Sequence, residues 1–198
     1  RATWDMNQKK VSLTADDAGA KNYFYSQHPD QEGLYFSAAT GEYDLKVNSI
    51  LAGGVPYIPV SDVHVIPDSG KVAVAAGATI TTLHNARVMA DSLQQFHKLY
   101  AGNINVLSRN AFSGTALHDY QNAASDSFKL QFADFVYKQH QLKKKSNINT
   151  TFAQAMVRET DNFYIFPHIR YRGNVNMYSY RPHMDFDGDL KLNFTGKE

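Results

Sequence analysis

Two stretches near the end of the chain decide the fold: Pro167-His-Ile-Arg-Tyr-Arg-Gly-Asn-Val-Asn-Met177 and Pro182-His-Met-Asp-Phe-Asp-Gly-Asp-Leu-Lys-Leu192. Proline, histidine and glycine recur at the same offsets in both, and four apolar positions recur with them. Within each copy, apolar and polar residues alternate, which is the period of a strand with one buried face. The glycine interrupts the alternation, as it would at a turn or bulge. We therefore expect both 167–177 and 182–192 to form a strand, a bend and a second strand.

Related patterns occur earlier in the chain. The segment 63–74 alternates on both sides of the turn Pro67-Asp-Ser-Gly70, and 102–108 (Gly-Asn-Ile-Asn-Val-Leu-Ser) follows the pattern of 173–179. Self-similarity of this kind is typical of solenoids and stacked sheets, whose units bury their apolar faces only against neighbours. The sequence predicts an all-β fold of repeated strand–bend–strand units, arranged as a β-solenoid or as a twisted antiparallel stacked sheet.

One segment, 86–100, fits two structures. Its apolar residues lie at helical spacing, and alanine and glutamine favour a helix. The same residues also fit two strands broken at Asp91 and Ser92, and the sheet-like flanks favour this second interpretation. No linker or low-complexity stretch divides the chain, so we expect a single β-rich domain over 1–198. Because the chain begins at Arg1 without methionine or a signal peptide, we interpret it as a fragment of a longer chain.

Composition excludes several classes of function. The formal net charge of +1 at pH 7 provides no strongly basic surface for nucleic acid. We interpret the basic run Lys143–Lys145 as an exposed loop. The absence of cysteine excludes disulfides and thiol chemistry, and no apolar run approaches the roughly 18 residues of a membrane helix.

The acidic residues of the second copy suggest calcium, but their spacing does not fit. Counted from Asp185, the glycine comes at the fourth position, whereas an EF-hand loop needs glycine at the sixth and glutamate at the twelfth. In the first copy, arginines occupy the positions equivalent to two of these aspartates. We therefore predict structural charge pairing between the copies, on the solvated face, by Arg170, Arg172, Asp185 and Asp187.

Catalytic motifs are absent from the sequence. It contains no Gly-x-Ser-x-Gly elbow, P-loop or dinucleotide-binding glycine pattern. His168 and His183 occupy equivalent positions, but zinc needs three or four ligands, and no spacing completes the set. We predict no catalytic residue, no cofactor and no metal. A metal-dependent hydrolase centred on His118, Asp119 or the His168/His183 pair is the least favoured alternative.

Tyrosines near the end of the chain provide a second alternative. Aromatic surfaces bind sugars, and a possible glycan platform consists of Tyr164, Tyr171, Tyr178 and Tyr180. Tyrosines that alternate along a strand are more often half-buried packing residues.

Three segments carry a family resemblance: Ile66-Pro-Asp-Ser-Gly-Lys-Val-Ala-Val74, Leu83-His-Asn-Ala-Arg-Val-Met-Ala90 and Phe163–Met177. With them, roughly residues 34–194 resemble large, exported, β-rich envelope proteins of Bacteroidota-type Gram-negative bacteria, mostly uncharacterised. The resemblance implies an envelope location, a much longer parent chain and no known catalytic residues.

These observations lead to one expected function. We expect a non-enzymatic structural or interaction module of a large cell-envelope or surface protein, located in the periplasm, outer membrane or cell surface. Its partners would be other envelope proteins or further domains of the same chain, because repeat units leave unpaired sheet edges at both ends. A glycan-binding β module and a viral structural protein are the remaining alternatives.

Overall fold

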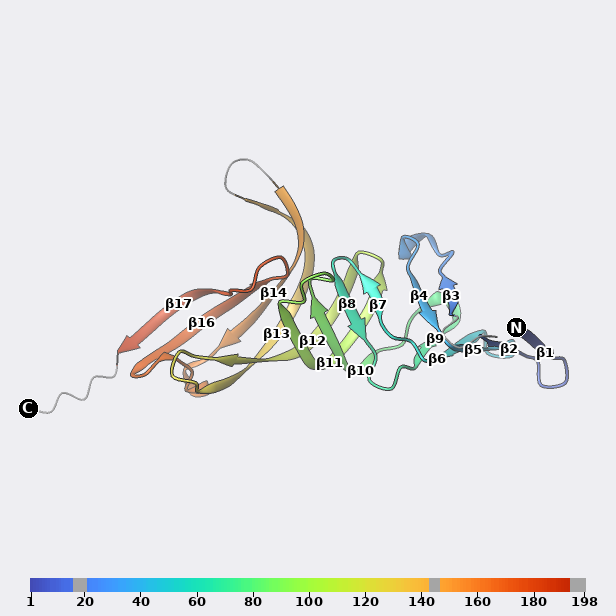
Figure 1. Cartoon of the computed structure of the whole chain (residues 1–198), viewed down its shortest axis with the longest axis horizontal. Helices are drawn as coiled ribbons and strands as arrows, with labels where there is room; N and C mark the ends of the chain where they lie inside the picture. Colours follow the sequence, from blue (N-terminus) through green and yellow to red (C-terminus); the bar gives the residue numbers. More distant parts are fainter. Residues whose placement is uncertain (16–20, 143–146, 193–198) are drawn as a thin grey trace, which may run out of the picture.

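The computed structural model describes residues 1–15, 21–142 and 147–192, and in these ranges the chain is all-β (Figure 1). The segment Lys143–Lys145 lies outside the described residues. The first of three sheets has the strand order β1-β2-β5-β6-β9. Its strands are β1 (Ala2–Asp5), β2 (Lys10–Thr14), β5 (Thr40–Asp44), β6 (Ser49–Gly53) and β9 (Val72–Val74). The second sheet is a hairpin of β3 (Asn22–Tyr25) and β4 (Tyr35–Ala38).

The third and largest sheet has the order β15-β16-β14-β13-β12-β11-β10-β8-β7. In addition, β17 pairs with β16, on the side opposite β14 and β15. Its strands are β7 (Ile58–Val60), β8 (Val63–Ile66), β10 (Leu83–Ala90), β11 (His97–Ser108), β12 (Ala111–Gln121), β13 (Ser127–Gln141), β14 (Asn147–Val157), β15 (Tyr164–Phe166), β16 (Ile169–Tyr178) and β17 (Asp185–Leu192). The described helical segments are single 3-10 turns, η1 (Pro29–Gln31), η2 (Ala76–Ala78) and η3 (Glu159–Asp161). In these ranges no helix is long and apolar enough to cross a membrane.

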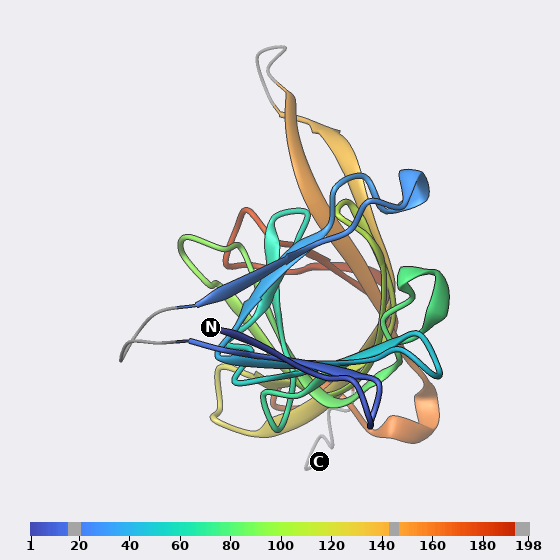
Figure 2. The same ribbon diagram turned by 90° about the vertical axis from the view of Figure 1, so that its right-hand side faces the viewer.

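The molecule is elongated because most strands pair with a neighbour in sequence. The chain advances from the first sheet at one end to β16 and β17 at the other (Figure 1). Viewed along this axis, the strands curve around a shared interior (Figure 2). One continuous apolar cluster, reaching from Leu34 to Met177, fills that interior. The strands supply it by alternation, as in β11, where Leu99, Ile104 and Val106 are buried.

The ambiguous segment 86–100 forms strands, as its flanks indicated. It contains most of β10 and the start of β11, joined by a turn in which Asp91 Oδ1 accepts hydrogen bonds from the backbone N–H of Leu93 and Gln94 at 2.9 and 3.2 Å. The helical spacing includes residues that do not face the core. Leu93 lies in the turn between the strands and is 90% exposed. The buried residues keep a period of two within each strand: Ala86, Val88 and Ala90 on β10, and His97 and Leu99 on β11.

The two repeated stretches form the neighbouring strands β16 and β17. They run antiparallel because a short loop joins them, and their register places Gly173 directly opposite Gly188. The expected bend at each glycine is absent. Both strands continue through the glycine without a register shift, although Gly173 has φ +140°. Every strand pairing in the described ranges is antiparallel, and no solenoid is found there.

A polar contact joins two distant parts of the large sheet. Asp62, in the turn between β7 and β8, reaches Thr151 on β14 and Ser179 after β16. Its carboxylate accepts hydrogen bonds from the Thr151 backbone N–H at 3.1 and 3.2 Å and from the hydroxyl groups of both residues. We call these three residues the Asp62 clasp. The clasp joins segments that are far apart in the strand order of the sheet.

Candidate functional site

The four tyrosines predicted as a platform lie in different surroundings. Tyr178 and Tyr180 are neighbours, with ring centroids 6.1 Å apart. Tyr171 is only 4% exposed, and its hydroxyl donates to the Asn174 carbonyl oxygen at 2.6 Å. Tyr164 lies on β15, beneath the Arg170 guanidinium at 5.6 Å. Burial removes Tyr171 from any binding surface, so the structure brings together only two members of the predicted platform.

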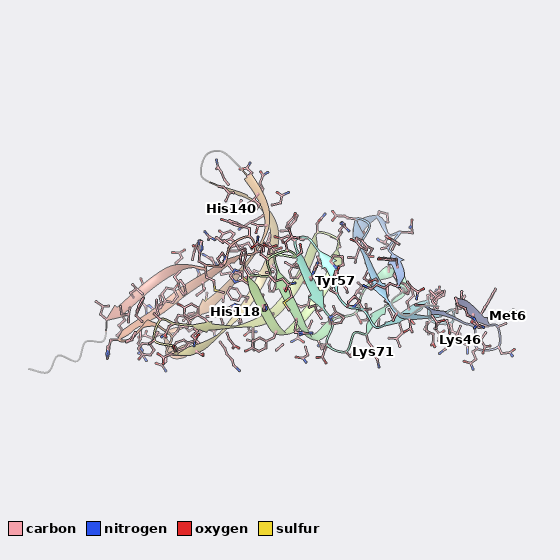
Figure 3. The ribbon with its side chains drawn as sticks, in the orientation of Figure 1. Met6, Lys46, Tyr57, Lys71, His118 and His140 are labelled. Carbon is pink, nitrogen blue, oxygen red and sulfur yellow. The ribbon has the colours of Figure 1, made fainter. Side chains whose placement is uncertain are left out.

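Tyr178 and Tyr180 belong to a larger group, which we call the aromatic–cationic cluster: Lys138, His140, Phe152, Tyr178, Tyr180 and Arg181. It lies where β13 and β14 extend beyond the rest of the sheet, with His140 on the projecting part (Figure 3). The His140 ring lies 4.6 Å from the Tyr178 ring, and the Arg181 guanidinium lies over Tyr178 at 4.6 Å. The Lys138 ammonium lies 3.6 Å above Phe152.

These contacts change what the cluster offers to a ligand. Sugar rings stack on open aromatic faces, but Arg181 covers one face of Tyr178 and Lys138 covers one of Phe152. The cluster instead presents positive charge beside aromatic edges, while Arg181 also pairs with Asp185. Lys138, His140 and Phe152 could not be assigned to Tyr178 from sequence spacing, because the β13–β14 and β14–β16 registers together bring them there.

A second group of stacked aromatic rings was not predicted from the sequence. Tyr23 and Tyr25 on β3 and Tyr35 on β4 stack at 6.2 and 5.7 Å, and the Arg109 guanidinium lies over Tyr35 at 4.9 Å. Because the rings stack on each other, this column presents mostly edges and hydroxyl groups to solvent. The alternation Tyr-Phe-Tyr at 23–25 was the available signal, but the cross-strand partner depended on the register Tyr25↔Tyr35.

The predicted charge pairing takes a different form. Arg172 pairs with Asp189, its direct neighbour on β17, at 3.1 Å, and with Glu159 at 3.4 Å. Arg170 lies opposite Lys191, and Asp187 lies opposite Asn174. Asp185, the first residue of β17, pairs with Arg181 in the preceding loop. The four residues named in advance are therefore not paired with one another, because the antiparallel hairpin reverses the order of the second copy.

The candidate metal residues do not converge. His168 precedes β16 and His183 follows it, so the ten residues of that strand separate them by roughly 30 Å. The Asp119 carboxylate accepts a hydrogen bond from the Tyr100 hydroxyl at 2.6 Å, which raises the pKa of that tyrosine. In residues 1–15, 21–142 and 147–192, no group of three His, Asp or Glu residues could hold a metal ion.

His118 instead packs against His97, with ring centroids 5.8 Å apart. Figure 3 places His118 within the large sheet. His97 is 1% exposed, and its Nε2 lies 2.8 Å from the Arg181 carbonyl oxygen. Burial and the neighbouring His97 lower the pKa of His118 to about 4, and burial also lowers the pKa of His97. Both imidazoles are therefore neutral at pH 7 and pack against each other.

β17 is an edge strand of the large sheet. In the described part of the chain, no strand pairs with the side of β17 that faces away from β16. Leu190 and Leu192 are 60% and 57% exposed, although they alternate with polar residues as core residues do. At the other end of the molecule, β1 is the edge strand, and Trp4 and Met6 are 64% and 73% exposed (Figure 3).

Comparisons with known proteins identify no relative of this chain. A scan against models of protein families finds no match, and searches of curated proteins and of solved structures find none.

Proposed function

We propose that this chain is a non-enzymatic structural and interaction module of a large cell-envelope or surface protein. Its sheet edges pack against further β units of the same chain or against partner proteins, so that units of this kind stack along the long axis. The observation that carries the proposal is the uncovered edge of β17, with its exposed Leu190 and Leu192.

The physical basis is the cost of an open edge. An edge strand presents unpaired N–H and C=O groups, which template the addition of another strand. Natural edges are usually protected by short length, by lysine or by a bulge. β17 has eight residues, pairs with β16 without a register shift and exposes two leucines, so its protection consists of charged side chains, three aspartates and Lys191. A strand added to this edge would cover the leucines.

Crosslinking in cells that produce the parent chain tests this proposal. A photoreactive residue placed at Leu190 should give one defined adduct in the envelope fraction, identified by mass spectrometry as a partner or as another part of the same chain. The matched control is Leu107 on β11, which is 53% exposed but lies on a strand paired on both sides. Equal adduct yields at both positions, or a parent chain in the cytosol, would contradict the proposal.

The aromatic–cationic cluster supports a second candidate function, the binding of acidic polysaccharide. The observation that supports this function is that Lys138, His140 and Arg181 all lie against the Tyr178 ring. This arrangement suits an anionic sugar better than a neutral one. An array of acidic and neutral glycans tests it. Acidic glycans should bind more tightly at low salt, and Tyr178→Ala should abolish the signal while Tyr25→Ala preserves it. Equal binding of neutral glycans would exclude this function.

A further inference from the structure

A cavity of about 500 Å³ lies between the β3–β4 hairpin and the first sheet. We call it the hairpin pocket. The hairpin and η1 form one wall, β5, β6 and β9 form the opposite wall, and η2 forms the rim. Its volume falls within the range of small-molecule sites, which are typically concave and mostly apolar. It is separate from the β17 edge and from the aromatic–cationic cluster, so the proposed function does not account for it.

The aromatic wall of the pocket is held in place by specific contacts. Phe24 and Phe36 stack with ring centroids 5.3 Å apart and planes 14° apart. Phe24 lies directly on Gly41 of β5, where an added Cβ would come within 2.5 Å of the ring. The rim is fixed by Gln31, whose side-chain amide donates to the Ala78 carbonyl oxygen at 2.7 Å. The pocket is therefore bounded by contacts among β3, β4, β5, η1 and η2.

The lining of the pocket indicates the chemistry of its ligand. Aliphatic side chains from Leu34, Ile50, Val74 and Ile80 complete the apolar surface, and none of the lining residues carries a charged side chain. A charged ligand would lose its hydration without gaining a partner there, which is costly. The site therefore suits an uncharged molecule.

One polar group in the wall can orient such a molecule. The Tyr43 hydroxyl donates to Asn48 Oδ1 at 2.9 Å, which fixes the Asn48 amide. In the described part of the chain, the NH₂ of that amide has no further partner, so it can donate to a ligand. We propose that the hairpin pocket binds an uncharged, mainly apolar small molecule whose hydrogen-bond acceptor, such as a ring ketone or an ester carbonyl, accepts from Asn48.

Titration of the chain with Nile red tests the proposal, because this dye is uncharged, flat and apolar and carries a ring carbonyl. Saturable binding at one equivalent, with a blue-shifted emission, is expected. Ile50→Trp fills the pocket and should weaken binding at least about tenfold. Leu51→Trp is the matched control, since Leu51 is the next residue of β6 and is 52% exposed. It should bind the dye as the unmodified chain does.

Further variants keep the proposal falsifiable if Ile50→Trp does not fold, as judged by circular dichroism. Ala76→Phe, at the exposed rim, should also weaken binding. Asn48→Gly preserves the left-handed turn position, where Asn48 has φ 50°, and should weaken the dye severalfold by removing the donor. Binding that does not saturate, or equal losses in Ile50→Trp and Leu51→Trp, would overturn the pocket. Equally tight binding of an anionic naphthalene sulfonate would overturn the assignment to an uncharged ligand.

Discussion

Two glycines allow β16 and β17 to approach each other closely. Gly173 and Gly188 face each other across β16 and β17, and a Cβ added to Gly188 would lie 2.1 Å from the Arg172 carbonyl oxygen. The phenol oxygen of Tyr171 would lie 2.8 Å from a Cβ at Gly173, so this aromatic side chain covers the space that the glycine leaves. The repeated glycine therefore serves close packing of two strands.

Gly188→Ala should destabilise the chain strongly, because the atom that its Cβ meets is backbone and cannot rotate away. Gly188 does not have a positive φ, so the effect isolates steric conflict. We expect a loss of about 2–3 kcal/mol in the free energy of unfolding. Gly33→Ala is the control: Gly33 has φ +72° and nothing near its Cβ, so it should lose only about 1 kcal/mol. Urea unfolding measures the free energy of unfolding of both variants. Equal losses in the two variants would show that β16 and β17 move apart easily to admit the added methyl group.

The paired histidines predict sensitivity to acid. The unfolded chain takes up protons near the ordinary histidine pKa of 6.5, whereas folded His118 resists protonation until the pH is about 4. Stability should therefore fall as the pH falls through this window, by up to about 3 kcal/mol in total. His118→Phe should reduce the difference in melting temperature between pH 7 and pH 4.5. The control is His28→Asn, which keeps a capping residue at η1. Equal acid sensitivity in both variants would contradict this role.

At the scale of single elements, the local sequence pattern predicts where strands form, but it does not predict which strand each one contacts. Alternation of apolar residues correctly indicated strands over most of the chain, because burial of one face is a local property of a strand. It was ambiguous at 86–100, because the helical spacing there included Leu93, which lies in the turn between two strands and is 90% exposed. The bend expected at Gly173 was wrong because glycine in a strand also permits close approach of a partner, and the partner is not visible in the local pattern.

The candidate sites were harder to predict for the same reason. Of the four tyrosines predicted as a platform, Tyr178 and Tyr180 are neighbours, and they are only two residues apart in sequence. The addition of Lys138 and His140 depended on the register of β13 with β14. The hairpin pocket combines Phe24 with Ile50 and Ile80, and no periodicity connects segments so far apart in sequence.

The β16–β17 hairpin carries an exposed ion network whose contribution should be small. Arg172 is 57% exposed and Asp189 73% exposed, so solvent weakens their attraction. Arg172→Gln should cost no more than about 1 kcal/mol at low salt and almost nothing at high salt. Arg87→Gln on β10 is the control, since Arg87 is exposed and has no ion pair within the described ranges. A loss that persists at high salt would indicate that the Arg172 side chain acts by packing.

At the scale of the whole molecule, the Asp62 clasp explains how a sheet of successive hairpins keeps its curvature. Sheet twist alone bends neighbouring strands, but it does not fix the distance between strands separated by several positions. Asp62 connects the β7–β8 turn to Thr151 and Ser179, 89 and 117 residues later. Next to the clasp, the hydroxyls of Thr150 and Ser179 share a hydrogen bond of 2.7 Å, so the polar groups of this region satisfy one another.

Asp62→Ala should therefore destabilise the molecule and loosen one end of the large sheet. Thr151 and Ser179 are buried, and their hydroxyls would lose a charged acceptor, at a cost of about 3 kcal/mol. Asp68→Ala is the matched control. Asp68 accepts one exposed hydrogen bond from Asn85 at 2.8 Å, and its loss should change stability by less than about 0.5 kcal/mol. Urea unfolding measures the free energies, and hydrogen exchange reports the Thr151 amide. If that amide exchanged equally slowly in both variants, the clasp would not hold these distant segments of the sheet together. The curvature would then have to arise from the buried apolar cluster alone.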